Sequence, residues 1–159
     1  MAAVASRASE SAESLAMMAS ATVIGSLTIP GHPEHVSDTR SFVTKALGEA
    51  DAATEVAVLL ASETVTNSVL HSNSRRPGGT VTITVVEVGG GVRIEVSDDG
   101  SELSAPVVKG EGCVTGGHGL FLVQSLATQW GYTKDELGTT VWFWLTRGCG
   151  CSAPGDLPD

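Results

Sequence analysis

Glu63, Asn67 and His71 stand at steps of four in the segment SETVTNSVLHS, and their types and spacing are suited to chemistry. In an α-helix this spacing places the three side chains along one side. At about 100° per residue, Glu63 and Asn67 also fall within about 20° of Val56, on a side that carries several leucines. A carboxylate and an amide on an apolar helix face are costly unless they are paired. Either structural partners satisfy them, as an ion pair and a core amide, or a ligand does.

Three further segments carry residue types suited to ligand binding. Asp98-Asp99-Gly100 ends a predicted strand, where a carboxylate emerges and glycine permits close approach of a ligand or of backbone. Gly116-Gly117-His118-Gly119-Leu120 opens a predicted helix, whose N–H groups and positive end favour phosphate oxygens. Gly138-Thr139-Thr140 enters the last predicted strand with hydroxyls that either reach a ligand or support strand pairing. Each segment taken alone is also typical of an ordinary turn, helix start or strand.

Helices and strands that must position these residues follow from hydrophobic periodicity. In chain order they are a strand at 22–29, helices at 33–47 and 51–72, a hairpin of strands at 80–88 and 92–97, a helix around 120–127, and strands at 130–134 and 138–146. Val23, Leu27 and Ile29 are expected on one buried face, and the helix at 51–72 is expected to pack on both flanks. Residues 100–117 have no period, which predicts a long mobile loop. The elements predict an α+β fold, a two-layer sandwich with a mixed, mostly antiparallel sheet and helices on one face.

Composition restricts the class of protein. The chain has 159 residues, 42% of them hydrophobic, which fits one domain. Its net charge of −9 argues against direct binding to nucleic acid. Residues 1–20 contain two glutamates and no basic start, so they do not resemble a secretory signal, and no apolar run is long enough to span a membrane. We therefore expect a cytoplasmic protein.

Both ends of the chain are expected to lie outside the folded domain. We predict a low-complexity segment at 1–20, a folded domain at 21–146 and a disordered tail at 147–159. The three cysteines, Cys113, Cys149 and Cys151, are read as reduced thiols without a zinc site.

The last predicted strand is apolar on both faces. Trp142 and Trp144 share one side, and the residues between and beside them share the other. One face is expected to meet the helices. The other is covered either by residues 1–20 or by a second subunit in a homodimer.

The order of the motifs resembles that of GHKL, or Bergerat-fold, ATPase domains over roughly residues 20–146. More narrowly, it is similar to that of bacterial anti-sigma-factor serine/threonine kinases. SETVTNSVLHS resembles the N box of the family, SDDG its G1 box, GGHGLFLV its G2 box and GTTVWFWL its last box. The resemblance implies a Bergerat fold, with residues 21–146 as a histidine-kinase-like domain that binds ATP and Mg²⁺.

Matching positions imply a role for each motif. Asn67 would coordinate Mg²⁺ between the phosphates, and Asp98 would accept a hydrogen bond from the adenine amino group, with Gly100 allowing the base to approach. Residues 101–116 would be the ATP lid. Glu63 would be the general base that takes a proton from the attacking hydroxyl or water. The remaining nucleotide-binding residues would be Gly117, His118, Gly119 and Leu120 at the phosphates and Thr139 or Thr140 near the base.

Two positions depart from the pattern of the family. The G1 box often reads Asp-x-Gly-x-Gly, but Glu102 occupies the last position here. Anti-sigma kinases tend to carry a basic residue just before the G2 glycines, where this chain has Thr115 and Gly116, and Lys109 is the only cation in residues 101–116. Because phosphoryl transfer needs its negative charge neutralised, this loss disfavours transfer more than binding. His118 either substitutes when protonated or is a solvated loop residue.

Three functions are compared. The first is an anti-sigma-type protein serine/threonine kinase that phosphorylates an anti-sigma antagonist and sequesters a sigma factor, and Glu63 favours it. The second is an ATP-binding partner-switching module without catalysis, which the missing lid cation favours. The third, an interaction domain without nucleotide, leaves the combined motifs unexplained.

Overall fold

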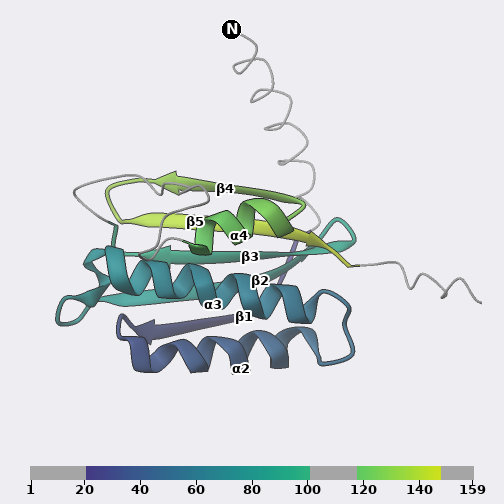
Figure 1. The fold of residues 1–159 in the computed structure, drawn as a ribbon, viewed down its shortest axis with the longest axis horizontal. Helices are drawn as coiled ribbons and strands as arrows, with labels where there is room; N and C mark the ends of the chain where they lie inside the picture. Colours follow the sequence, from purple (N-terminus) through teal and green to yellow (C-terminus); the bar gives the residue numbers. More distant parts are fainter. Residues whose placement is uncertain (1–20, 101–117, 148–159) are drawn as a thin grey trace, which may run out of the picture.

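The computed structural model describes residues 21–100 and 118–147, with residues 118–121 described only as part of a helix (Figure 1). The lid segment 101–116, Gly117, the three cysteines, residues 1–20 and residues 148–159 lie outside the described residues. In chain order the elements are β1 (Thr22–Pro30), the 3₁₀ helix η1 (Pro33–His35), α2 (Val36–Leu47), α3 (Thr54–His71), the 3₁₀ helix η2 (Asn73–Arg75), β2 (Thr80–Val88), β3 (Gly91–Asp98), α4 (His118–Leu126), β4 (Gln129–Lys134) and β5 (Thr139–Thr146).

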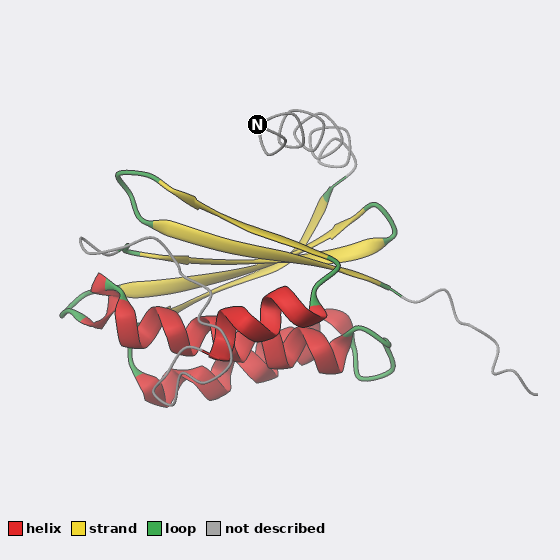
Figure 2. Cartoon of the chain, turned by 45° about the horizontal axis from the view of Figure 1, so that its top comes forward, coloured by secondary structure: helices red, strands yellow, loops and turns green. Residues whose placement is uncertain are grey.

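The fold is a two-layer α+β sandwich. Its five strands form one sheet in the order β1-β2-β3-β5-β4, and the helices cover one face of that sheet (Figure 2). This confirms the predicted architecture. In the described part of the chain every strand pair is antiparallel, where a mixed sheet was predicted.

The hairpin of β2 and β3 shows how the sequence dictates one connection. Gly89 and Gly90 have φ angles of 59° and 74°, which is the left-handed region that both central residues of a type I′ turn require. Glycine occupies that region without steric cost, and the strands pair through Val88 and Gly91 directly beside the turn. The predicted hairpin is confirmed.

Strand β1 departs from the predicted alternation at one residue. Val23 pairs with Val86 and Gly25 with Val85, so Ile24 is an extra residue in a β-bulge. A bulge reverses which side chains face the core. Ile24 consequently packs against the core, and Val23 is 63% exposed, so its predicted place on the buried face is wrong.

Helix α3 packs against α2 on one flank and α4 on the other, as predicted. The side of α3 that carries several leucines was predicted to be its buried side, but two of these leucines are exposed. Leu59 and Leu70 are 40% and 43% exposed, and Glu63 and Asn67 between them are only partly buried. The buried side instead carries mainly small residues, among them Ala57, Ala61, Thr64 and Ser68. Glu63 and Asn67 therefore do not lie on a buried apolar face, and burial alone does not require them to be paired.

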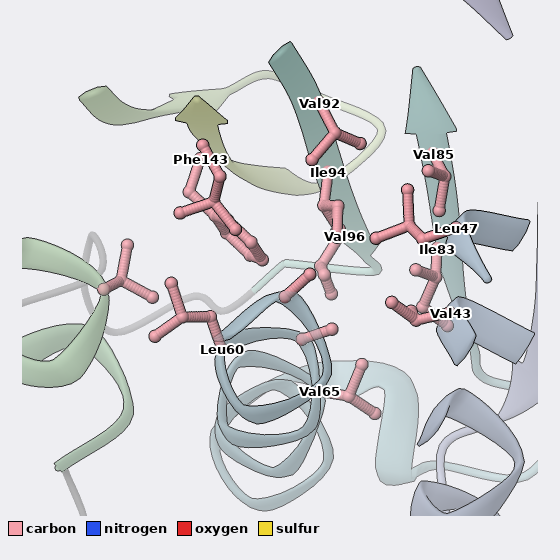
Figure 3. Close-up of a cluster of buried hydrophobic side chains, with 14 of the residues drawn as sticks. Val43, Leu47, Leu60, Val65, Ile83, Val85, Val92, Ile94, Val96 and Phe143 are labelled. Carbon is pink, nitrogen blue, oxygen red and sulfur yellow. The ribbon is translucent and has the colours of Figure 1, made fainter. Parts of the chain in front are cut away.

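A single core lies between the helices and the sheet. Side chains from α2, α3 and the central strands meet in it, including Val43, Leu60, Ile83, Ile94 and Phe143, all 0% exposed (Figure 3). Because the helices pack on one face only, side chains in the regular stretches of the central strands alternate between this core and the opposite face. Within the described residues, no helix combines the length and hydropathy of a membrane span.

The opposite face of the sheet carries the two tryptophans. The Trp144 ring lies against Gly91, and its Nε1 donates to the Val88 carbonyl at 3.1 Å. The Trp142 ring lies against Gly131, and the Arg93 guanidinium stands 4.2 Å from its centroid. Both indoles are partly buried by this packing within the sheet. A homodimer contact across this face stays a prediction.

Arg147 closes the described part of the chain after β5. Its guanidinium pairs with Asp51 at 2.8 Å and with Glu87 at 2.7 Å, joining the α2–α3 connection to β2. The predicted tail therefore includes one residue that is anchored to the domain.

Candidate functional site

Asp98, the last residue of β3, is the centre of the candidate site. Gly100 donates its backbone N–H to the Asp98 Oδ1 at 2.8 Å, and the Ser68 hydroxyl and the Thr139 backbone N–H also donate to the carboxylate. Burial raises the pKa of Asp98 above its ordinary value, and these three hydrogen bonds offset that rise only in part. The neighbouring Asp99 charge adds to the rise. The result is a fixed, partly buried acceptor at the end of a strand.

Two glycines shape the backbone around this carboxylate. Gly100 is buried and has a φ of 75°, a conformation that glycine adopts readily. Gly138, in the β4–β5 connection, has a φ of 152°, and a Cβ built on it would overlap the Asp98 carbonyl oxygen. Asp135 holds this connection by accepting the backbone N–H groups of Leu137 at 2.8 Å and of Gly138 at 3.1 Å. The β4–β5 turn is thereby packed directly onto the end of β3.

The two threonines of the last motif lie on opposite faces of β5. Thr139 stands opposite Asp98 in the β3–β5 ladder, is 6% exposed and shares its face with Phe143. Thr140 points to the other face, where its Oγ1 lies 2.8 Å from the Ser97 Oγ. Because side chains alternate along a strand, only one of them is able to face Asp98. That residue is Thr139, and the structure does not bring Thr140 to the same side.

The second half of α3 carries Glu63 and Asn67 toward the same end of the fold. Ser68, one residue after Asn67, contacts Asp98, and Asn73 just beyond the helix donates its backbone N–H to the Gly100 carbonyl at 2.7 Å. Within residues 21–100 and 118–147, neither Glu63 nor Asn67 has a side-chain hydrogen bond or ion pair. The structural ion pair and core amide considered from the sequence are thus not found among these residues. His71, at the end of α3, is exposed.

The start of α4 points to this end as well. Helix α4 packs beside α3 and runs in the opposite direction, so its first turn lies toward the C-terminal half of α3 (Figure 1). The first N–H groups of a helix have no partner within it, which suits them to an anion. His118, Gly119 and Leu120 form this first turn, whereas Gly117 lies outside the described residues.

Ser68 is a member of the site that the motif pattern did not single out. It is 4% exposed on the side of α3 that faces the sheet, and its hydroxyl donates to Asp98. The only signal in the sequence is its position next to Asn67. A serine in a helix is also compatible with an ordinary bond to the preceding turn, so nothing in its type distinguishes it.

Comparisons with known proteins bear on the family and the fold of this chain. Residues 29–145 match a family described as the histidine kinase-like ATPase domain. Among solved structures, the chain is similar to the RsbU and RsbW domains of Rv1364c from Mycobacterium tuberculosis, with a TM-score of 0.57 and 20% sequence identity. The match covers 77% of this chain and 32% of that one, so this chain spans about a third of its length, and the likeness shows the fold alone. A search of curated proteins finds no significant match.

Proposed function

Because the chain belongs to the histidine kinase-like ATPase domain family, we propose that it binds ATP with Mg²⁺ at the end of the fold where α3, β3 and the β4–β5 turn meet. The observation that carries this proposal is the Asp98 carboxylate. It is partly buried, held by three donors and followed by the buried Gly100, one of whose backbone groups is among those donors.

Asp98 has the properties needed to recognise an adenine base. A carboxylate has about four acceptor positions, so three protein donors leave capacity for an amino group. Partial burial makes that added hydrogen bond stronger than it would be in water. Thr139 stands on the same face and is the threonine that we assign to the base, in preference to Thr140.

Asn67 and the first turn of α4 are suited to the phosphates and the metal. Mg²⁺ prefers oxygen ligands and usually keeps several waters, so one amide oxygen with phosphate oxygens is a plausible shell. The Asn67 amide is partly exposed and has no partner within the described residues, which leaves its oxygen available. We assign Gly117, His118, Gly119 and Leu120 to the phosphates through their backbone N–H groups.

We further propose that the protein is an anti-sigma-type serine/threonine kinase that phosphorylates an anti-sigma antagonist and binds a sigma factor. Bound ATP would supply the phosphoryl group, and Mg²⁺ would neutralise its charge. Glu63 stands one helical turn before Asn67 and is partly exposed, and we assign its carboxylate as the group that accepts the proton of an acceptor hydroxyl.

An ATP-binding module that switches partners without catalysis is the second proposal. The residue types in the lid favour it, because Thr115 and Gly116 stand where anti-sigma kinases tend to carry a basic residue. Nucleotide binding tolerates the loss of one such cation better than phosphoryl transfer does.

Titration calorimetry of ATP with Mg²⁺ tests the binding proposal. We expect saturable binding to the wild type, weakened in Asp98→Asn and in Asn67→Ala. Thr140→Val is the matched control and should bind as the wild type does. Absence of binding by the wild type at millimolar ATP would overturn the proposed nucleotide site.

Hydrolysis of γ-labelled ATP separates the two functions. If Glu63 is the general base, Glu63→Ala should slow phosphate release roughly 10²- to 10⁴-fold and leave ATP affinity within about twofold. Glu55→Ala, at an exposed glutamate in the first turn of the same helix, is the control. An unchanged rate in Glu63→Ala would remove the base assignment, whereas ATP binding without phosphate release by the wild type would favour the module without catalysis.

A further inference from the structure

Ser74 is fully buried in η2, and its hydroxyl interrupts the end of the β2–β3 ladder. Regular pairing ends at Thr82 and Ser97, and the same register would bring Val81 opposite Asp98 and then Thr80 opposite Asp99. Their backbones do not bond directly. Instead the Asp99 N–H donates to the Ser74 Oγ at 2.9 Å, and the Ser74 Oγ donates to the Thr80 carbonyl at 2.7 Å. One serine hydroxyl thus stands where a direct ladder bond would be.

Two neighbouring bonds complete this connection. The Thr80 N–H donates to the Asp99 Oδ2 at 3.0 Å, and the Asn73 N–H donates to the Gly100 carbonyl at 2.7 Å. Asp99 and Gly100 are therefore tied on one side to β2 and on the other to the segment that leaves α3. Asp98 lies directly before them, so the direction of its carboxylate depends on where these two residues are held.

Ser74 is held in place by close contacts with two glycines. A Cβ built at Gly31 or at Gly79 would overlap the Ser74 backbone, so both glycines are in close contact with it. The Gly31 N–H also donates to the Gly79 carbonyl at 3.2 Å. Ser74 itself is 0% exposed. Because the serine has no room to move, its hydroxyl is a rigid reference point for the end of β3.

We propose that Ser74 is a positioning residue for nucleotide recognition, which fixes Asp98 and Gly100 relative to Asn67 through the end of the β2–β3 ladder. This inference rests on the proposed function. Ser74 does not reach the ligand itself; it sets the strand end that carries the carboxylate. Its removal should therefore weaken recognition of adenine through Asp98 and through no other residue.

A double-mutant cycle on the full chain tests this inference. We expect Ser74→Ala to weaken ATP binding roughly threefold to tenfold, the factor associated with one lost hydrogen bond. In the Asp98→Asn background the same change should alter affinity less than about twofold. Ser62→Ala is the matched control, because the Ser62 hydroxyl is buried, donates to the Val58 carbonyl at 2.7 Å and accepts from Arg40 at 3.2 Å, away from Asp98. An equal loss in both backgrounds would overturn the proposal.

Amide hydrogen exchange in the absence of nucleotide separates this proposal from the proposed function. We expect Ser74→Ala to speed exchange of the Gly100 amide, which is bonded to Asp98, and to leave the amides in the middle of β3 unchanged. Uniform acceleration would indicate general destabilisation and contradict a positioning role. If the wild type binds no nucleotide, the proposed function fails, and the Gly100 exchange still decides whether Ser74 holds the strand end. Ser74→Cys, which keeps the shape with weaker hydrogen bonding, replaces Ser74→Ala if that variant does not fold.

Discussion

Asp98 combines two opposing influences on one carboxylate. Burial favours its protonated form, and the hydrogen bonds from Ser68, Gly100 and Thr139 favour its ionised form, with burial the larger. A carboxylate held in this balance is sensitive to the loss of a single donor. Removing any one of these donors should therefore change the pKa of Asp98.

Ser68→Ala should raise the pKa of Asp98 further, because the lost hydrogen bond favours the carboxylate. Carboxyl NMR titration measures this pKa directly, with Ser62→Ala as a control that leaves it unchanged. The folded-state pKa lies above the ordinary value of 3.8, so the stability that Asp98 contributes is present below pH 3.8 and is lost as pH rises through the folded pKa. Adenosine binding should weaken as pH falls through the same pKa, because the neutral carboxyl accepts the hydrogen bond of the amino group more weakly than the carboxylate does. A folded-state pKa below 3.8 would contradict the dominance of burial.

Thr139 and Thr140 are neighbouring threonines whose hydroxyls can be removed one at a time and compared. Thr139→Val should weaken ATP binding, because its hydroxyl is the one on the face of Asp98, whereas Thr140→Val should not. Both changes remove one hydroxyl from β5 and suit a strand, so their effects on stability should be similar. Calorimetry of the two variants measures the difference. Equal weakening in both would contradict the assignment of Thr139 alone.

At the scale of elements, the strands and helices follow the sequence closely where local chemistry is decisive. The Gly89-Gly90 turn and the stop of α2 at Gly48, with a φ of 87°, are dictated by glycine. The motif order identified the elements that carry Asp98 and Asn67. Sequence alone did not reveal the bulge at Ile24, because a one-residue insertion in a strand depends on packing against the rest of the sheet.

The orientation of α3 shows a second limit. Leucines suggested one buried side, yet the helix buries alanine, serine and threonine beside Leu60 and leaves Leu59 40% exposed. Packing distance decides this, since small residues allow close approach of a helix to a sheet. For the same reason Ser68 could not be recognised, because its role depends on a contact with Asp98 across layers. Contacts made between elements distant in sequence have no local signature.

Gly138 is the residue that locks the β4–β5 turn onto β3. Gly138→Ala should destabilise the fold by roughly 2–4 kcal/mol, because a Cβ would overlap the Asp98 carbonyl at a φ that alanine rarely adopts. It should also weaken ATP binding, since Asp98 would shift. Gly78→Ala is the control: its φ is 80° but nothing lies within 4 Å, so about 1 kcal/mol is expected without loss of affinity. Urea unfolding and calorimetry measure both quantities, and equal costs at the two positions would contradict the packing argument.

For the whole molecule, three segments far apart in sequence meet at one end of the fold (Figure 1). They are the C-terminal end of α3, the end of β3 and the β4–β5 turn, and α4 begins beside α3 with its N-terminus directed toward the same end. Hydrogen bonds already link these three segments, through Ser68, Asn73 and Thr139. A ligand bound there would contact both layers at once, so its binding energy should stabilise the domain as a unit.

Thermal unfolding with and without ligand tests this coupling. ATP with Mg²⁺ at about 100 times its Kd should add about 2.7 kcal/mol and raise the Tm by several degrees. EDTA should remove most of that rise in the wild type, because the metal would no longer join Asn67 to the phosphates. Asn67→Ala should then melt alike with and without EDTA, and Asp98→Asn should show a smaller rise than the wild type in both conditions. A rise in the Tm of the wild type that EDTA leaves intact would contradict the assignment of Asn67 to the metal. In that case, a smaller rise in Asp98→Asn than in the wild type would still support the contact between Asp98 and the base.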